Sequence, residues 1–198
     1  MADVGRLARR VRRRSDPARP RDPWPGEDRR VNLLHSQVFL RPLESADVAT
    51  YVSWGRDRRF CEHAGWTVDL PDAALEAHWR ALVERPKPDL LRQAAVAGDD
   101  VIGYVDLFGA EPERRELGYV VGPSGRWGRG LGGIVARLGV EYGFGVLGLQ
   151  EIWAEAVDAN QASVRILESL GMTETGRGQD ETFLGVASYY RCFVLRRP

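Results

Sequence analysis

The sequence predicts a mixed α/β (α+β) domain preceded by an N-terminal tail. Strand-like and helix-like segments follow one another along residues 36–198 in the order β-α-α-β-β-β-α-β-α-β, without an internal repeat. Hydrophobic residues make up 43% of the 198 residues, which is enough for a buried core. Residues 1–35 are instead rich in arginine and proline. These observations divide the chain into a tail, residues 1–35, and one folded domain, residues 36–198.

The charge of the tail is opposite to that of the domain. Residues 1–30 contain ten arginines and five acidic residues, a net charge of +5, whereas residues 31–198 carry −5. Residues 16–26 hold four prolines and few apolar residues, so they cannot bury enough surface to offset their chain entropy. We therefore expect a mobile tail. An arginine arm that contacts RNA, the ribosome or a partner subunit is an alternative, and a mitochondrial presequence is disfavoured by the acidic residues.

The first half of the domain predicts a strand, two helices and a hairpin. Ser45 and Asp47 are typical helix-start residues, and apolar residues follow them at helical spacing. Pro71 opens the second helix, and Pro86 ends it because proline has no backbone N–H to donate. A Gly-Asp-Asp turn at 98–100 separates two strand-like runs and indicates a hairpin. The strands are expected at residues 38–43, 90–97 and 101–108.

Strands and helices alternate in the second half of the domain. Apolar residues recur at three- and four-residue spacing in two segments, which predicts helices. Gly171 provides a stop for the second of these helices, because glycine readily adopts the left-handed conformation of a helix C-terminus. In chain order, the elements are expected at residues 116–121 (strand), 130–144 (helix), 151–157 (strand), 161–170 (helix) and 189–195 (strand).

Composition excludes several classes of protein. There are 28 Lys and Arg residues and 28 Asp and Glu residues, so a globally basic nucleic-acid binder is not expected. The two cysteines, Cys61 and Cys192, form no CxxC pair, and the three histidines show no metal-ligand spacing. No apolar run approaches the roughly 20 residues that span a bilayer. We therefore expect a cytoplasmic protein without a disulfide framework, a metal site or a membrane partner.

The most informative segment is a Gly- and Arg-rich turn between a predicted strand and a predicted helix. Residues 116–133 read ELGYVVGPSGRWGRGLGG. Glycines let backbone N–H groups point into one concavity, and a helix N-terminus adds partial positive charge, so a pyrophosphate fits here. Arg126 or Arg129 can add charge-assisted hydrogen bonds. No GxxxxGK[ST] motif is present and GxGxxG is matched only loosely; a tight turn before a packed helix is the alternative.

Residues 127–132, Trp-Gly-Arg-Gly-Leu-Gly, resemble the acyl-CoA-binding motif of the GNAT N-acetyltransferase superfamily, Gln/Arg-x-x-Gly-x-Gly/Ala. Trp127 departs from the general pattern but is similar to the RimJ/RimL branch of ribosomal-protein N-terminal acetyltransferases. Residues 158–172 resemble the Asn-x-x-Ser…Glu-x-Leu-Gly-Phe signature of that branch, and residues 40–54 resemble its first strand and helix. The resemblance covers about residues 37–197. It implies a GNAT-like fold with a central, mixed, mostly antiparallel sheet flanked by helices.

The resemblance also implies a reaction, the direct attack of a primary amine on the thioester of acetyl-CoA. The amine would belong to a protein N-terminus or to a small molecule. Glu116 is the expected general base, although it could instead be a rim carboxylate paired with Arg114 or Arg115. Many relatives carry a Tyr as the acid for the leaving thiolate where this chain has Leu167. Ser163 is then the expected acid, and a bond from Ser163 to the backbone at the helix start is the alternative.

Binding of the cofactor is implied for a larger set of residues. In the family, backbone groups of the strand hold the pantetheine arm, with their side chains not involved, and the N–H near Val120 would stabilise the oxyanion. Asn160 would both cap its helix and bond the CoA arm. The expected cofactor-binding residues are Tyr119, Val120, Val121, Arg126, Trp127, Gly128, Arg129, Gly130, Leu131, Gly132, Asn160 and Ser163. Tyr189 and Tyr190 are further candidates for the acid, and His63 is one for substrate contact.

Two other functions stay open at this point. A catalytically inactive, regulatory acyl-CoA-binding module is compatible with Leu167 in place of a Tyr. An RNA-directed, toxin-like acetyltransferase would use the arginine-rich tail, but the negative charge of the domain counts against it. The expected partners are acetyl-CoA and an amine acceptor. Nucleic acid is expected only through the tail, and a homodimer is left open.

Overall fold

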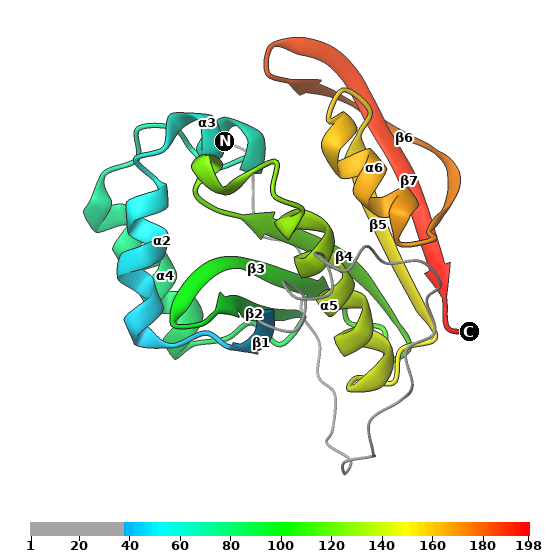
Figure 1. Cartoon of the computed structure of the whole chain (residues 1–198), viewed down its shortest axis with the longest axis horizontal. Helices are drawn as coiled ribbons and strands as arrows, with labels where there is room; N and C mark the ends of the chain where they lie inside the picture. Colours follow the sequence, from blue (N-terminus) through cyan, green and yellow to red (C-terminus); the bar gives the residue numbers. More distant parts are fainter. Residues whose placement is uncertain (1–37) are drawn as a thin grey trace.

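The computed structural model describes residues 38–198, so the expectations for the tail lie outside the described residues. Seven strands form one sheet in the order β1-β2-β3-β4-β5-β7-β6, with helices on both faces (Figure 1). All neighbouring strands are antiparallel except β4 and β5. The predicted fold class, a mixed and mostly antiparallel sheet flanked by helices, is therefore confirmed.

The strands are β1 (Val38–Pro42), β2 (Leu90–Ala97), β3 (Asp100–Phe108), β4 (Arg114–Val121), β5 (Glu151–Val157), β6 (Thr173–Phe183) and β7 (Val186–Arg196). The helices are α2 (Val48–Trp54), α3 (Arg58–Ala64), α4 (Asp72–Glu84), α5 (Leu131–Gly145) and α6 (Gln161–Ser169). Two short 3₁₀ turns, η1 (Ser45–Asp47) and η2 (Ser124–Arg126), precede α2 and α5. No helix in this part of the chain is long and apolar enough to cross a membrane.

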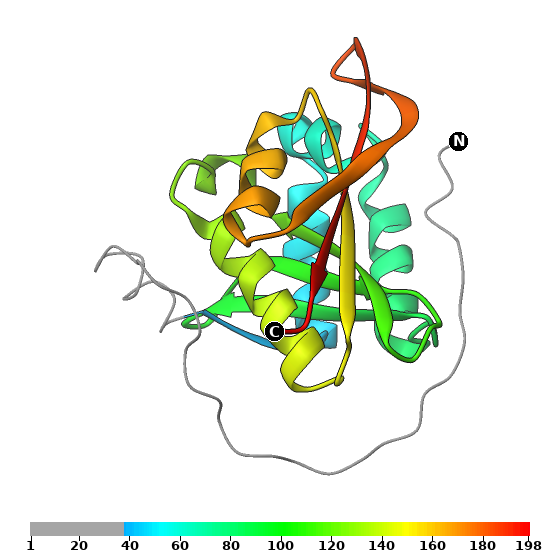
Figure 2. The same ribbon diagram turned by 90° about the vertical axis from the view of Figure 1, so that its right-hand side faces the viewer.

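Two of these elements, α3 and β6, were not predicted. The buried residues of α3, Phe60 and Cys61, are adjacent, so this segment shows no apolar residues at helical spacing. The start of α3 depends on the Asp57 side chain, which accepts a hydrogen bond from the Phe60 N–H. The β6 strand is mostly exposed and polar along both faces, so it lacks the alternation that marks a strand. It forms because β7 pairs with it along most of its length. The tip of this β6–β7 hairpin projects beyond the rest of the described domain (Figure 2).

The helices form two layers. Helices α5 and α6 cover one face of the sheet, where Val105, Leu117 and Val135 belong to one buried apolar cluster. Helices α2, α3 and α4 lie on the opposite face, where Tyr51 and Trp79 belong to a second cluster (Figure 1). The burial of these two apolar faces is the main stabilising contribution to such a sheet.

The sheet opens in its middle, between β4 and β5. Their parallel pairing covers only Arg114–Glu116 against Glu151–Trp153. Beyond these residues β4 continues to Val121 and β5 to Val157 without pairing to each other. The backbone groups of β4 that point away from β3 therefore lack a strand partner after Glu116. The candidate site lies at the end of β4 that this divergence leaves unpaired.

Candidate active site

A cavity of about 440 Å³ lies where β4 ends against the beginnings of α5 and α6. Its walls come from α3, the end of β4, the loop before α5 and the first turns of α5 and α6. The structure brings together most of the predicted site residues here: Tyr119, Val120, Val121, Arg126, Trp127, Gly128, Gly130, Leu131, Gly132, Asn160 and Ser163. Arg129 and Glu116 are not among the lining residues.

The loop before α5 forms a cradle of backbone N–H groups. Gly130 is the residue before the helix, and its φ of +77° is one that L side chains rarely adopt. Leu131, Gly132 and Gly133 follow in the first helical turn and line the cavity. Because first-turn N–H groups have no partner within their helix, they are free to bind an anion. The cradle therefore suits a phosphate or pyrophosphate group.

Two side chains fix this loop to the body of the protein. The Trp127 Nε1–H donates to the Val121 carbonyl at 2.8 Å, which ties the loop back to β4. The Asp57 carboxylate accepts from the Ser124 N–H at 2.7 Å and from the Phe60 N–H at 3.0 Å. Partial burial opposes ionisation, but these hydrogen bonds hold the pKa of Asp57 below its ordinary value. Sequence reasoning missed the role of Asp57 in holding this loop, because Ser124, the loop residue that Asp57 binds, lies 67 residues further along the chain.

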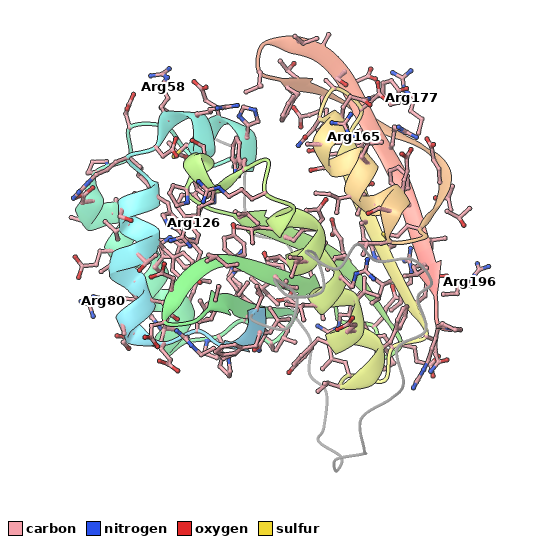
Figure 3. All side chains as sticks on the ribbon, viewed as in Figure 1. Arg58, Arg80, Arg126, Arg165, Arg177 and Arg196 are labelled. Atoms are coloured by element: carbon pink, nitrogen blue, oxygen red, sulfur yellow. The ribbon has the colours of Figure 1, made fainter. Side chains whose placement is uncertain are left out.

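Two arginines reach the cavity from opposite sides. Arg126 lines it from the loop, and its guanidinium forms an ion pair with Asp100 at 3.2 Å. Arg165 lines it from α6 (Figure 3) and was not predicted. Arg129 lies in the loop with an exposed side chain, outside the cavity wall. One of the cationic groups at this site, Arg165, therefore comes from α6 and lies outside the Gly- and Arg-rich motif of the loop.

The divergent edge of β4 forms another wall. Tyr119, Val120 and Val121 line the cavity, and β3 pairs with them along the other edge of the strand. The backbone N–H groups of Tyr119 and Val121 alternate with those that pair to β3 and face the gap that β5 leaves open, and the Val121 carbonyl on this side accepts from Trp127. An extended ligand can bind such an edge as an added strand would. The cavity therefore joins an anion cradle at one end to a strand edge at the other.

The first turn of α6 completes the wall. The Asn160 side chain caps this helix by accepting a hydrogen bond from the Ser163 N–H at 3.3 Å. The Tyr119 hydroxyl donates to the carbonyl of the same Ser163 at 3.4 Å. The side chain of Tyr119, which was expected to have no role, thus crosses from β4 to α6 inside the cavity wall.

Glu116 lies on β4 on the sheet face opposite α5, four residues before Val120. Its carboxyl is half-buried, and burial is the main reason that its pKa is raised to about 7. The nearby carboxylates of Glu155 and Asp106 raise this pKa further. Asp106 is itself held by Arg92, which donates two hydrogen bonds to it at 2.6 and 2.5 Å.

Among the ion pairs of residues 38–198, none joins Glu116 to Arg114 or Arg115, the pairing considered as an alternative. Arg114 pairs with Glu151 at 2.7 Å. Arg115 is buried, and its guanidinium donates to the Leu107 carbonyl at 3.4 Å. Glu116 is thus a carboxyl group with raised pKa and other carboxylates nearby, a combination that is frequent at catalytic sites.

Removing the neighbouring charge should lower the pKa of Glu116. In Glu155→Gln the carboxylate next to Glu116 becomes neutral, so ionisation of Glu116 meets less repulsion and its pKa should fall below 7. Titration of the Glu116 side-chain carboxyl by NMR measures this directly. The control is Glu151→Gln, on the same strand but paired with Arg114, which should leave the Glu116 titration unchanged. An unshifted Glu116 titration in Glu155→Gln would refute the electrostatic assignment.

The remaining candidates have different environments. His63 lines the cavity from α3, with its ring centre 4.9 Å from that of Trp127 and 5.5 Å from that of Phe183 on the hairpin. Tyr190 donates to the Glu181 carboxylate at 3.2 Å. Tyr189 lies under the Arg177 guanidinium at 4.2 Å. Neither tyrosine lines the cavity. Within residues 38–198 no group of three or more His, Cys, Asp or Glu side chains could hold a metal ion.

Comparison with known proteins identifies relatives of this domain. The family model of the acetyltransferase (GNAT) domain matches residues 37–173. The "Uncharacterized N-acetyltransferase p20" of Bacillus licheniformis is 32% identical over 84 residues, which cover 41% of this chain and 47% of that protein. The match thus spans about half the length of this curated relative.

Solved structures with the same fold include two acetyltransferases. A spermidine N-acetyltransferase from Vibrio cholerae, in complex with CoA and spermine, has a TM-score of 0.69 and 19% identity, covering 81% of this chain and 96% of that one. A GNAT-family acetyltransferase from Bacillus anthracis has a TM-score of 0.67 and 14% identity, covering 81% and 95%. At these identities the likeness shows the fold alone.

Proposed function

Because the chain belongs to the GNAT acetyltransferase family, we propose that it transfers an acetyl group from acetyl-CoA to a primary amine. The observation that carries this proposal is the continuous cavity, which joins an anion cradle at α5 to the open edge of β4. A CoA molecule has matching parts in the same order, a pyrophosphate and an extended pantetheine arm with amide groups. When bound, acetyl-CoA supplies an activated acyl group as a thioester.

The residues at each end of the cavity fit these parts. The N–H groups of Leu131, Gly132 and Gly133 would hold the pyrophosphate, and an added Cβ at Gly130 would stand in open space. Arg165 would supply positive charge beside them. The backbone groups of β4 would hold the pantetheine arm, and a backbone N–H near Val120 on the open edge, that of Tyr119 or Val121, would stabilise the oxyanion formed during acyl transfer.

Glu116 would act as the general base. A free α-amino group has a pKa of roughly 8 and a lysine side chain one of roughly 10, so either amine must lose a proton before it attacks at neutral pH. A carboxyl with a pKa of about 7 is partly ionised there and is basic enough to take that proton. A residue with the ordinary pKa of a glutamate would be a much weaker base.

The acceptor is proposed to be a small amine with more than one positive charge. Glu116, Glu155 and Glu181 all lie close enough to Tyr190 to affect its hydroxyl. Burial and the Glu181 carboxylate raise the pKa of Tyr190, and the other two carboxylates act in the same direction. Three carboxyl groups gathered around one tyrosine favour a polycation over a neutral or anionic acceptor. A protein N-terminus, as in the RimJ/RimL branch, is the second candidate acceptor, and this branch assignment stays a prediction.

The proposal is tested by incubating the protein with acetyl-CoA and a panel of acceptors. The panel contains spermidine, benzylamine and a peptide with a free α-amino group, and the readouts are thiol release and the mass of the product. We expect acetylated spermidine to form fastest. If acetyl-CoA binds but no thiol is released with any amine, the enzymatic proposal fails and the inactive binding module is favoured. Faster acetylation of the peptide would favour the second acceptor.

A further inference from the structure

The cavity contains a phenol that the proposed reaction has not yet used. Side chains along β4 alternate between the two faces of the sheet, so Tyr119 lies on the face opposite Glu116 and Val120. Its ring lines the cavity, and its hydroxyl reaches the first turn of α6. The base and the phenol thus lie on opposite sides of the strand whose edge would hold the acyl donor.

The hydroxyl of Tyr119 is only weakly held in this position. Its distance to the Ser163 carbonyl is 3.4 Å, longer than an ordinary O–H···O hydrogen bond. In an α-helix that carbonyl has a regular partner, the N–H of Leu167. Tyr119 can therefore turn its hydroxyl towards a ligand in the cavity without leaving a backbone group unsatisfied.

The other protic side chains of the cavity are less suited to give up a proton beside β4. The Trp127 indole N–H is occupied by the Val121 carbonyl. The His63 ring lies against Trp127 on the α3 wall. Ser163 lines the cavity close to Tyr119, but an aliphatic hydroxyl is a far weaker acid than a phenol.

We propose that Tyr119 is the catalytic acid, donating its phenolic proton to the sulfur that leaves during acyl transfer. This inference rests on the proposed acetyltransferase function. The Tyr119 hydroxyl would replace Ser163 in the role that sequence reasoning gave to the serine. The acid would thus come from the central strand rather than from α6, where Leu167 is buried and has no proton to donate.

The proton and electron balance of the step is complete. The acceptor ammonium loses one proton to Glu116, and its nitrogen forms a bond to the acyl carbon. The carbon–sulfur bond breaks, and the sulfur keeps the bonding electron pair and takes the proton of Tyr119. The nitrogen loses its second proton through solvent, which returns a proton to the Tyr119 oxygen. Glu116 then releases its proton to solvent, so one proton is released per acetyl transfer. Burial raises the pKa of Tyr119 to about 12, so the hydroxyl remains a donor throughout the physiological pH range.

The first test removes the hydroxyl. Tyr119→Phe should lower kcat roughly 100-fold, as expected for loss of a general acid, while the KM for acetyl-CoA changes little. One control accompanies it: Tyr142→Phe removes a hydroxyl from α5, outside the cavity wall, and should turn over like the wild type. Ser163→Ala tests the competing acid, and it should lower kcat far less than Tyr119→Phe does.

A second measurement separates catalysis from a structural role. Replacement of Tyr119 by a difluorotyrosine keeps the ring but lowers the phenol pKa. If the phenol is the acid, kcat of the substituted protein falls at alkaline pH values where kcat of the wild type does not. The affinity for acetyl-CoA stays unchanged. Wild-type kcat in Tyr119→Phe, or its loss in Ser163→Ala alone, overturns the inference. Absence of turnover in the wild type is a different result, which refutes the proposed function together with this inference.

Discussion

Gly130→Glu should weaken acetyl-CoA binding by more than about 100-fold, because it places a carboxylate at the mouth of the anion cradle. Gly130 precedes the first turn of α5, and its φ is +77°. A side chain there is strained by roughly 1–2 kcal/mol, which a folded domain tolerates. Apart from the chain immediately around Gly130, no atom of residues 38–198 lies within 4 Å of a Cβ added at this position. The chain should therefore fold normally, and isothermal titration with acetyl-CoA measures the loss.

Two variants separate charge from backbone strain. Gly130→Asn has a neutral side chain that tolerates the left-handed conformation, so it should bind acetyl-CoA more tightly than Gly130→Glu. Gly125→Glu adds the same charge in the same loop, at a position with open space that does not line the cavity. It should bind nearly as the wild type does. Equal affinity of Gly130→Glu and the wild type would mean that the pyrophosphate does not bind at the start of α5.

Glu116→Gln should reduce kcat about 100- to 10,000-fold at pH 8, the range typical of a lost general base. The wild-type rate should rise with pH through about 7, because burial, Glu155 and Asp106 raise the pKa of Glu116 to that value and only the carboxylate can accept a proton. In Glu116→Gln the rate should no longer rise with pH through about 7. Acetyl-CoA affinity should be unchanged, since Glu116 does not line the cavity. A wild-type pH profile in Glu116→Gln would remove Glu116 from the mechanism.

The thermal stability of Glu116→Gln shows whether this variant folds normally. The pKa of Glu116 rises from its ordinary value of 4.5 to about 7 on folding, so the folded protein binds the proton more tightly than the unfolded chain does. Stability therefore falls as pH rises from 4.5 to 7, and the full cost is present above pH 7. Glutamine does not ionise, so the Tm of Glu116→Gln at pH 8 should equal or exceed that of the wild type. A lower Tm would indicate that the carboxylate stabilises the fold.

The anion cradle could be predicted from sequence because its geometry is encoded locally. Gly128 and Gly130 both adopt positive φ values, which is the conformation that a Gly-rich turn before a helix provides. The Asn160 cap was predictable for the same reason, since a cap and its helix are adjacent in the chain. Glu116 was identified by resemblance, but its raised pKa depends first on its burial in the folded domain and then on Glu155 and Asp106, which two other strands supply.

The missed features depend on contacts between distant segments. Arg165 reaches the cavity only because α6 packs beside α5, and nothing in its local sequence marks it. The side chain of Tyr119 was set aside because the resemblance assigns the binding role of this strand to backbone groups. Its placement follows from the divergence of β4 and β5, which no pattern within either strand reveals. Site residues that come together only through contacts between distant segments thus cannot be predicted from local sequence patterns.

A crystal structure of the protein with CoA bound tests the proposed cofactor site most directly. We expect the pyrophosphate against the N–H groups of Leu131, Gly132 and Gly133, and the pantetheine arm along the open edge of β4 between Tyr119 and Val121. A nucleotide bound elsewhere, or a complex in which β5 closes onto β4 and leaves no room for the arm, would contradict this placement.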